Sequence, residues 1–198
     1  MMDERGVEQG LLTSVGLILA SAAVLFFVFS SFSSLRPSNT AIALESAASE
    51  VCGDVETVAS MAIPYAAERH YSYGFDVSIC ADYVAASSTN ITFVRPLAVR
   101  IVPGMYSWNG SLAWNNTNEM REYLNSSFNA TGTPERPIDD DRAAELYGLM
   151  DRASRSTLLN PIKLEAGRPL VIEKAFLYTY NGSSHILEAK SYVFVYQG

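Results

Sequence analysis

The chain has 198 residues, of which 48% are hydrophobic and 18% charged, and its formal net charge is −7. This acidic balance argues against nucleic acid or anionic lipid as a partner, because phosphate groups are bound by clusters of lysine and arginine. The length suffices for one domain with its own core beside a distinct N-terminal segment.

The range 11–35 is the most distinctive segment, because it has twenty-five consecutive residues without a charge. As a helix it would be about 37 Å long, against about 30 Å for the hydrocarbon core of a bilayer. A cleaved secretory signal would have a shorter apolar run and a basic leader. A helix in a soluble core is rarely so long without a charge. The pattern predicts a transmembrane helix over 11–35 after a cytoplasmic leader over 1–10.

Asn-X-Ser/Thr sequons are more frequent than this composition gives by chance. Such sequons accept glycans on exported domains, although Asn, Ser and Thr also cluster in loops. They predict a single-pass protein of the cell membrane, in contact with membrane lipid, whose C-terminal domain over 36–198 lies outside. The candidate glycosylation sites are Asn90, Asn109, Asn115, Asn125, Asn129 and Asn181.

Two cysteines, Cys52 and Cys80, are the only ones in the chain. An isolated pair in an exported domain predicts a disulfide. The alternative is a pair of small buried thiols.

After the apolar segment, the residues 36–40 predict a break, since Pro37 disfavours helix in the residue before it. A second helix follows, which ends near Pro64. Its apolar stripe packs either on the domain's own sheet or on the same helix of a neighbouring subunit. The stripe consists of Leu44, Ala48, Val51, Val55, Val58 and Ala62.

The rest of the chain alternates between strand and helix signals, which predicts an α+β domain rich in antiparallel sheet. Strands are expected over 71–80 and over 91–102, where Pro96 indicates an edge position or a break. Helices are expected over 119–128 and 142–154, the second one directly after the acidic residues 139–141. The ranges 170–180 and 185–196 predict a hairpin with its turn at 181–184. Its strands carry two aromatic sets, Phe176, Tyr178 and Tyr180, and Tyr192, Phe194 and Tyr196.

Catalytic motifs are missing from the sequence, which has neither HExxH, CxxC, a Walker loop nor a GxSxG elbow. The acidic run 139–141 lacks the ligand spacing of a calcium hand and suits a helix start instead. The histidines His70 and His185 have ordinary neighbours. We expect no enzyme, cofactor or metal, although Ser, His and Asp side chains could still meet in the folded chain.

The leader 3–10, directly followed by a long apolar helix and then by a β-rich, sequon-rich acidic domain, resembles archaeal type IV pilin-like surface proteins. The resemblance implies that a prepilin peptidase cuts between Gly6 and Val7. It also implies that the apolar helix packs in a filament core or stays in the membrane, with like subunits or other pilin-like envelope proteins as partners.

The sequence therefore predicts a membrane-anchored, pilin-like cell-surface protein with a structural or adhesive role and no catalytic activity. The alternative is an anchored monomeric module that binds a ligand or an envelope component through the aromatic residues of 108–114. An anchored hydrolase is the third candidate.

Overall fold

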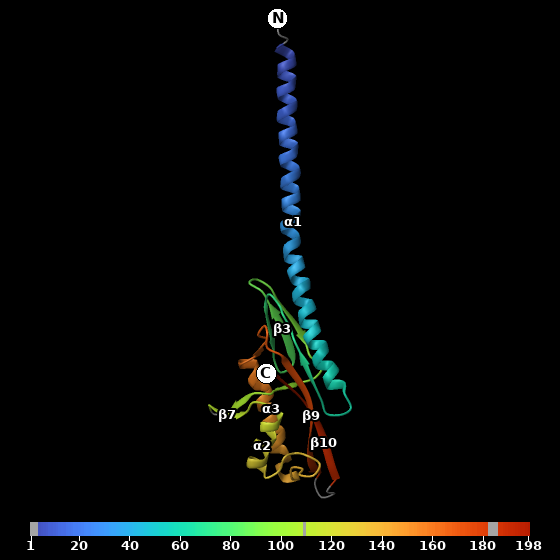
Figure 1. Cartoon of the computed structure of the whole chain (residues 1–198), viewed down its shortest axis with the longest axis vertical. Coiled ribbons are helices and arrows are strands. Elements are labelled where there is room, and N and C mark those ends of the chain that lie inside the picture. The colour runs from blue at the N-terminus through green and yellow to red at the C-terminus, as the bar shows by residue number, and fades with distance from the viewer. Residues whose placement is uncertain (1–3, 109, 182–185) are drawn as a thin grey trace. The chain divides into compact units, whose positions relative to one another are not determined.

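The computed structural model describes residues 4–108, 110–181 and 186–198, and the side chains of 20–30, 39–107, 110–181 and 186–198 among them. The chain forms two compact units, Met1–Ala43 and Leu44–Gly198. Helix α1 (Glu4–Ser60) contributes residues to both. The second unit contains every described strand and the two other described helices, so it has the α+β composition that the sequence predicts (Figure 1).

The main sheet of the second unit has the strand order β1-β9-β10-β5. The β9–β10 hairpin matches its prediction, and β1 adds to β9 in antiparallel register. The short strand β5 pairs in parallel with β10 over Val193–Val195 only. The four strands are β1 (Tyr65–Arg69), β5 (Ile101–Pro103), β9 (Leu170–Asn181) and β10 (Ile186–Gln197).

A second, wholly antiparallel sheet has the order β4-β3-β2-β8. Pro96 ends the edge strand β4 and separates it from β5, as its position in the sequence predicts. The remaining pair, β6 (Tyr106–Trp108) and β7 (Ser111–Trp114), forms a separate hairpin. The strands of the second sheet are β2 (Asp76–Ile79), β3 (Tyr83–Ser87), β4 (Thr92–Pro96) and β8 (Ile162–Lys163).

Two hydrophobic clusters cover opposite faces of the main sheet. Adjacent residues of a strand point to opposite sides, so neighbouring residues of one strand can belong to different clusters. Ile172 and Val193 belong to the cluster that contains the α1 stripe. Leu177 and Phe194 belong to the cluster with α2 (Thr117–Phe128) and α3 (Asp140–Leu159). The buried parity of β9 therefore changes at Lys174 and Ala175, which are both buried.

This change of parity decides how far the two aromatic sets of the hairpin are buried. Phe176, Tyr178 and Tyr180 are only half-buried, because the α2 and α3 side of β9 is filled by smaller residues of the opposite parity. On β10, Phe194 is fully buried in that cluster and Tyr192 packs against it, while Tyr196 is only half-buried.

Helix α1 differs from its prediction in two respects. It runs from Glu4 to Ser60 without the expected break at 36–40, since a proline removes one backbone hydrogen bond but does not prohibit a helix. The stripe from Leu44 to Val58 is buried as predicted, but Ala62 follows the helix and is exposed.

Membrane placement also needs correction. Across the residues that the structure describes, no helix combines the length and apolar composition needed to cross a bilayer. This finding contradicts the predicted transmembrane helix over 11–35 and the single-pass cell-membrane location with the C-terminal domain outside. Within that range, the side chains of 11–19 and 31–35 lie outside those described.

The remaining helices and strands are of the predicted type, but several differ from their predictions in length. Helices α2 and α3 occupy the predicted places, and α3 continues to Leu159. Over 71–80 every second residue from Tyr71 to Ile79 is buried or half-buried, but only Asp76–Ile79 forms a strand. Strand β1 was not expected, because its residues carry only one buried side chain, Ala67.

Candidate functional site

The apolar segment Val24–Phe29 of α1 lies in the first unit and is exposed to solvent. Its side chains keep between 43% and 76% of their accessible surface, and Phe26 and Phe29 have the largest exposed fraction. Six consecutive residues cover more than a full turn, so the helix is apolar on every side here. A helix that is apolar all round is normally buried.

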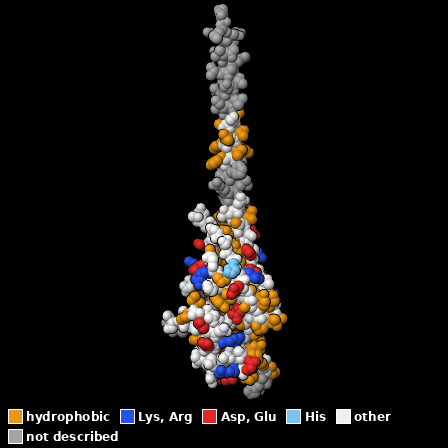
Figure 2. Space-filling view, viewed as in Figure 1, with side chains coloured by type: hydrophobic (Ala, Val, Ile, Leu, Met, Phe, Trp, Pro, Cys, Tyr) orange, Lys and Arg blue, Asp and Glu red, His pale blue; other side chains and the backbone are white. Residues whose placement is uncertain are grey.

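Residues flanking the apolar segment are small or uncharged. The described stretch 20–30 begins with Ala20, Ser21, Ala22 and Ala23 and ends with Ser30, and it has no charged residue. Figure 2 shows the hydrophobic side chains of this part of α1, without acidic or basic ones among them. Small side chains let helix backbones approach closely, so this surface suits contact with other helices.

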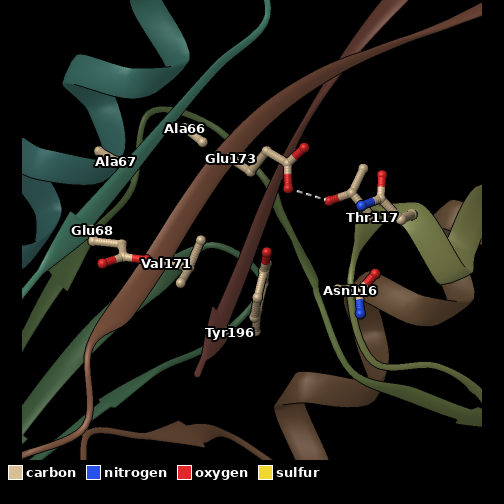
Figure 3. A pocket seen from close by; sticks show the side chains of 9 residues that line it. Ala66, Ala67, Glu68, Asn116, Thr117, Val171, Glu173 and Tyr196 are labelled. Atoms are coloured by element: carbon tan, nitrogen blue, oxygen red, sulfur yellow. Dashed lines mark hydrogen bonds between the residues drawn. The ribbon is translucent and has the colours of Figure 1, made fainter.

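A pocket with a volume of about 560 Å³ lies in the second unit, and we name it the Glu173 pocket. Strand register explains how its residues meet. Glu173 lies opposite Ala66 of β1, and Glu68 lies opposite Val171, so the two carboxylates are diagonal neighbours on one face of the sheet. Tyr196 of β10 is also paired with Val171 and completes this face (Figure 3).

Helix α2 closes the pocket with its first residues. Thr117 is 4% exposed and its hydroxyl donates to the Glu173 carboxylate, as the dashed line in Figure 3 marks. Asn116 caps α2 by accepting a hydrogen bond from the Glu119 amide at 3.0 Å. This cap fixes where the helix starts, and therefore where Thr117 meets the sheet.

Burial raises the pKa of Tyr196, and the negative charges of Glu173 and Glu68 and a hydrogen bond to Glu173 raise it further. Tyr196 is therefore a hydrogen-bond donor at neutral pH. Gly104 permits its position, since a Cβ on Gly104 would overlap the tyrosine ring. The pocket offers carboxylate acceptors and hydroxyl donors, which suit ligands rich in hydroxyl or amine groups.

The predicted disulfide is wrong, because Cys52 and Cys80 are both free and buried. The Cys52 thiol donates to the Glu56 carboxylate and to the Pro96 carbonyl, each at 3.5 Å. Cys80 follows β2, and its amide donates to the Tyr83 carbonyl at 2.9 Å. The alternative of two buried thiols therefore holds.

The candidate glycosylation sites within the described side chains are all exposed, namely Asn90, Asn115, Asn125, Asn129 and Asn181. Asn109 lies outside the described residues. The Asn115 sequon differs from the others, because its Thr117 is buried against Glu173. Glycosylation at the exposed sites stays a prediction.

Other candidate residues do not converge on one site. Gly6 and Val7, the proposed processing site, have side chains outside those described, as does His185, while His70 is exposed. In the described part of the chain no cluster of three or more potential metal ligands occurs, including at 139–141.

The expected aromatic contact surface over 108–114 also needs correction. Trp114 is fully buried, and its indole donates to the Pro103 carbonyl at 3.2 Å. The side chain of Trp108 lies outside those described.

The Glu173 pocket was not found from the sequence. One signal was available, since Glu173 and Lys174 are adjacent charges inside an otherwise apolar and aromatic strand. Charges at such positions need partners. The sequence does not say that Thr117, 56 residues away, is the partner.

Comparison with known proteins gives no relative for this chain: no family model, no curated protein and no solved structure matches it.

Proposed function

We propose that this protein is a structural subunit that assembles with copies of itself through the apolar segment of α1, without catalytic activity. The observation that carries the proposal is the exposure of Val24–Phe29 on all sides of the helix. One partner helix would cover a single side, so burying this segment requires several neighbouring helices.

Identical copies suit this surface. The stretch 20–30 has no charge, so copies brought together there meet no like-charge repulsion. The resemblance of the N-terminal sequence to archaeal type IV pilin-like proteins supports the same proposal, because packing in a filament core is one of the two outcomes that it implies for the apolar helix. The assembly would then carry many copies of the unit Leu44–Gly198.

Sedimentation velocity and electron microscopy of the full chain in aqueous buffer test the proposal. We expect ordered, concentration-dependent particles for the wild type and monomers for Phe27→Asp, since each copy would bring a charge into the apolar contact. Leu159→Asp is the matched control, because Leu159 is an exposed apolar residue of α3, 86% exposed, and its change should leave assembly intact.

Four outcomes would each overturn the proposal. The wild type could be monomeric, form amorphous aggregates, or occur only as single chains within detergent micelles, or the Phe27→Asp variant could assemble normally. A stable monomer would favour the second candidate, a ligand-binding module, which the Glu173 pocket supports through its paired carboxylates and the Tyr196 hydroxyl.

A further inference from the structure

A second cavity, of about 320 Å³, lies where the last turn of α1, strands β5 and β10, and helix α3 meet. We name it the Ser154 cavity. Its volume is at the lower end of the range for small-molecule sites, which is about 300–1,000 Å³. Much of its wall is apolar and consists of Ala59, Val99, Val102, Met150 and Val193.

The position of the cavity follows from the short strand β5. Pairing between β5 and β10 covers Val193–Val195 and stops there. Lys190, Ser191 and Tyr192 precede this stretch of β10, so no residue of β5 pairs with them, and they line the cavity together with α3.

Two hydroxyl groups in this cavity have no hydrogen-bond partner in the described part of the chain, Ser154 Oγ and Tyr192 Oη. Ser154 is 1% exposed, so bulk water does not solvate it. Burial, and next the neighbouring Tyr147, raise the pKa of Tyr192, so its hydroxyl keeps its proton at neutral pH. Both groups are donors without an acceptor, which is a costly arrangement in a protein interior.

Positive charge predominates around these donors. Lys190 Nζ lies 4.3 Å from the ring centre of Tyr147 and 5.8 Å from that of Tyr192. No ion pair joins Lys190 to a carboxylate among the described residues, and the nearby Glu188 accepts a hydrogen bond from Asn181.

The one carboxylate that lines the cavity is already neutralised. Asp151 pairs with Arg100 at 2.6 Å and with Arg155 at 2.9 Å. The lining thus contains two cations, Arg100 and Lys190, and one anion that is already paired, so a ligand with a negative group is favoured over a cationic one.

We propose that the Ser154 cavity binds a small monocarboxylate with an apolar body. Its carboxylate accepts hydrogen bonds from Ser154 and Tyr192 and faces the ammonium group of Lys190. Its apolar part packs against Val102 and Met150, which a bare inorganic anion would leave uncovered. The site is independent of the proposed assembly, because it shares no residue with the apolar segment.

Equilibrium dialysis of the full chain against radiolabelled benzoate tests this site, because dialysis works for monomers and assemblies alike. We expect saturable binding of one benzoate per chain and at least tenfold weaker binding of the neutral isostere benzamide. Lys190→Met should weaken benzoate binding about tenfold or more, and Tyr192→Phe several-fold. Lys163→Met is the control for lost charge and should bind like the wild type, since Lys163 is an exposed residue of β8.

Absence of saturable benzoate binding, equal binding of benzamide, or unchanged binding by Lys190→Met would overturn the proposal. The Phe27→Asp variant separates the two proposals. It should lose assembly and bind benzoate normally, so failure of one proposal leaves the other measurable.

Discussion

Lys174 Nζ donates a hydrogen bond to the Ala59 carbonyl oxygen at 2.6 Å, and a second one to the Met61 carbonyl. Both carbonyls lie where α1 ends, at a helix terminus whose last carbonyl groups have no partner within the helix. Lys174 is 8% exposed, so this cation on β9 serves as a buried cap for α1. It fixes the end of the helix on the main sheet.

Replacing this cap should be costly. We expect Lys174→Met to lower the free energy of unfolding by about 2–4 kcal/mol, because methionine fills similar space but leaves two buried carbonyls without a donor. Urea denaturation measures the loss. Lys163→Met is the control for the same exchange at an exposed position, and its free energy of unfolding should stay within about 0.5 kcal/mol of the wild-type value. Similar stability of the two variants would show that the Lys174 hydrogen bonds contribute nothing net.

Replacing Gly104 or Gly53 by alanine should have opposite effects on the stability of the protein. A Cβ at Gly104 would overlap the ring of Tyr196, so Gly104→Ala should destabilise the protein by about 1–3 kcal/mol. A Cβ at Gly53 of α1 meets nothing within 4 Å, so Gly53→Ala should stabilise it by up to about 1 kcal/mol through helix propensity. Thermal unfolding compares them, and a stabilising Gly104→Ala would contradict the close approach of Tyr196.

Thiol chemistry separates free cysteines from a disulfide. Burial, and next the hydrogen bond and charge of Glu56, raise the pKa of Cys52, so its thiol is protonated at neutral pH. We expect no change in melting temperature on adding dithiothreitol. Alkylation should label both cysteines, but only after the protein is unfolded. A lower melting temperature under reducing conditions would contradict the free thiols at Cys52 and Cys80.

Sequence periodicity predicted the elements whose environment is set locally. The stripe from Leu44 to Val58 repeats at helical spacing and is buried, and the β9–β10 hairpin follows from two β-rich runs around a turn sequence. Strand β1 was not predicted, because it forms by pairing with β9, whose residues lie more than 100 positions further along the chain. Tyr65, for example, pairs with Lys174.

Features that depend on three-dimensional neighbours could not be predicted. The sequence of β9 does not reveal that its buried parity changes after Lys174, because this depends on α1 covering one face and α3 the other. The spacing of Cys52 and Cys80 likewise says nothing about where the two sulfurs point. The sequence around Ser154 is that of an ordinary helix, and it does not show that Ser154 lines a cavity together with residues of β10.

Alkaline pH should weaken the fold through its buried tyrosines. Burial is the largest cause that raises the pKa of Tyr71, Tyr73 and Tyr192. Tyr71 also donates to Asp54 at 2.6 Å, and Tyr73 to Glu50 at 3.0 Å. An unfolded tyrosine ionises near pH 10, so above that pH the unfolded chain loses protons that the folded chain keeps. The stability contributed by these groups is complete below about pH 9 and is lost as pH rises further.

Urea midpoints at pH 7.5 and pH 10.5 measure this loss, and the double variant Tyr71→Phe/Tyr73→Phe should lose less than the wild type between the two. Absorbance at 295 nm gives an independent check, because part of the 11 tyrosines should ionise only on unfolding. Ionisation of all of them near pH 10 in the folded protein would contradict the burial of these hydroxyls.

Removing the unpartnered hydroxyls should stabilise the ligand-free protein. A buried donor without an acceptor costs about 1–3 kcal/mol, so Ser154→Ala and Tyr192→Phe should each raise the free energy of unfolding by about 1 kcal/mol. Thr157→Val is the contrasting variant, because the Thr157 hydroxyl donates to the Ser154 carbonyl at 2.8 Å in the same helix and its removal should not stabilise. Urea denaturation without added carboxylate measures all three. Benzoate at saturating concentration should remove most of the advantage of Tyr192→Phe, because its several-fold weaker affinity lowers the stabilisation by benzoate by about 1 kcal/mol relative to the wild type. Stability losses in both hydroxyl variants, with or without benzoate, would mean that these groups already have partners.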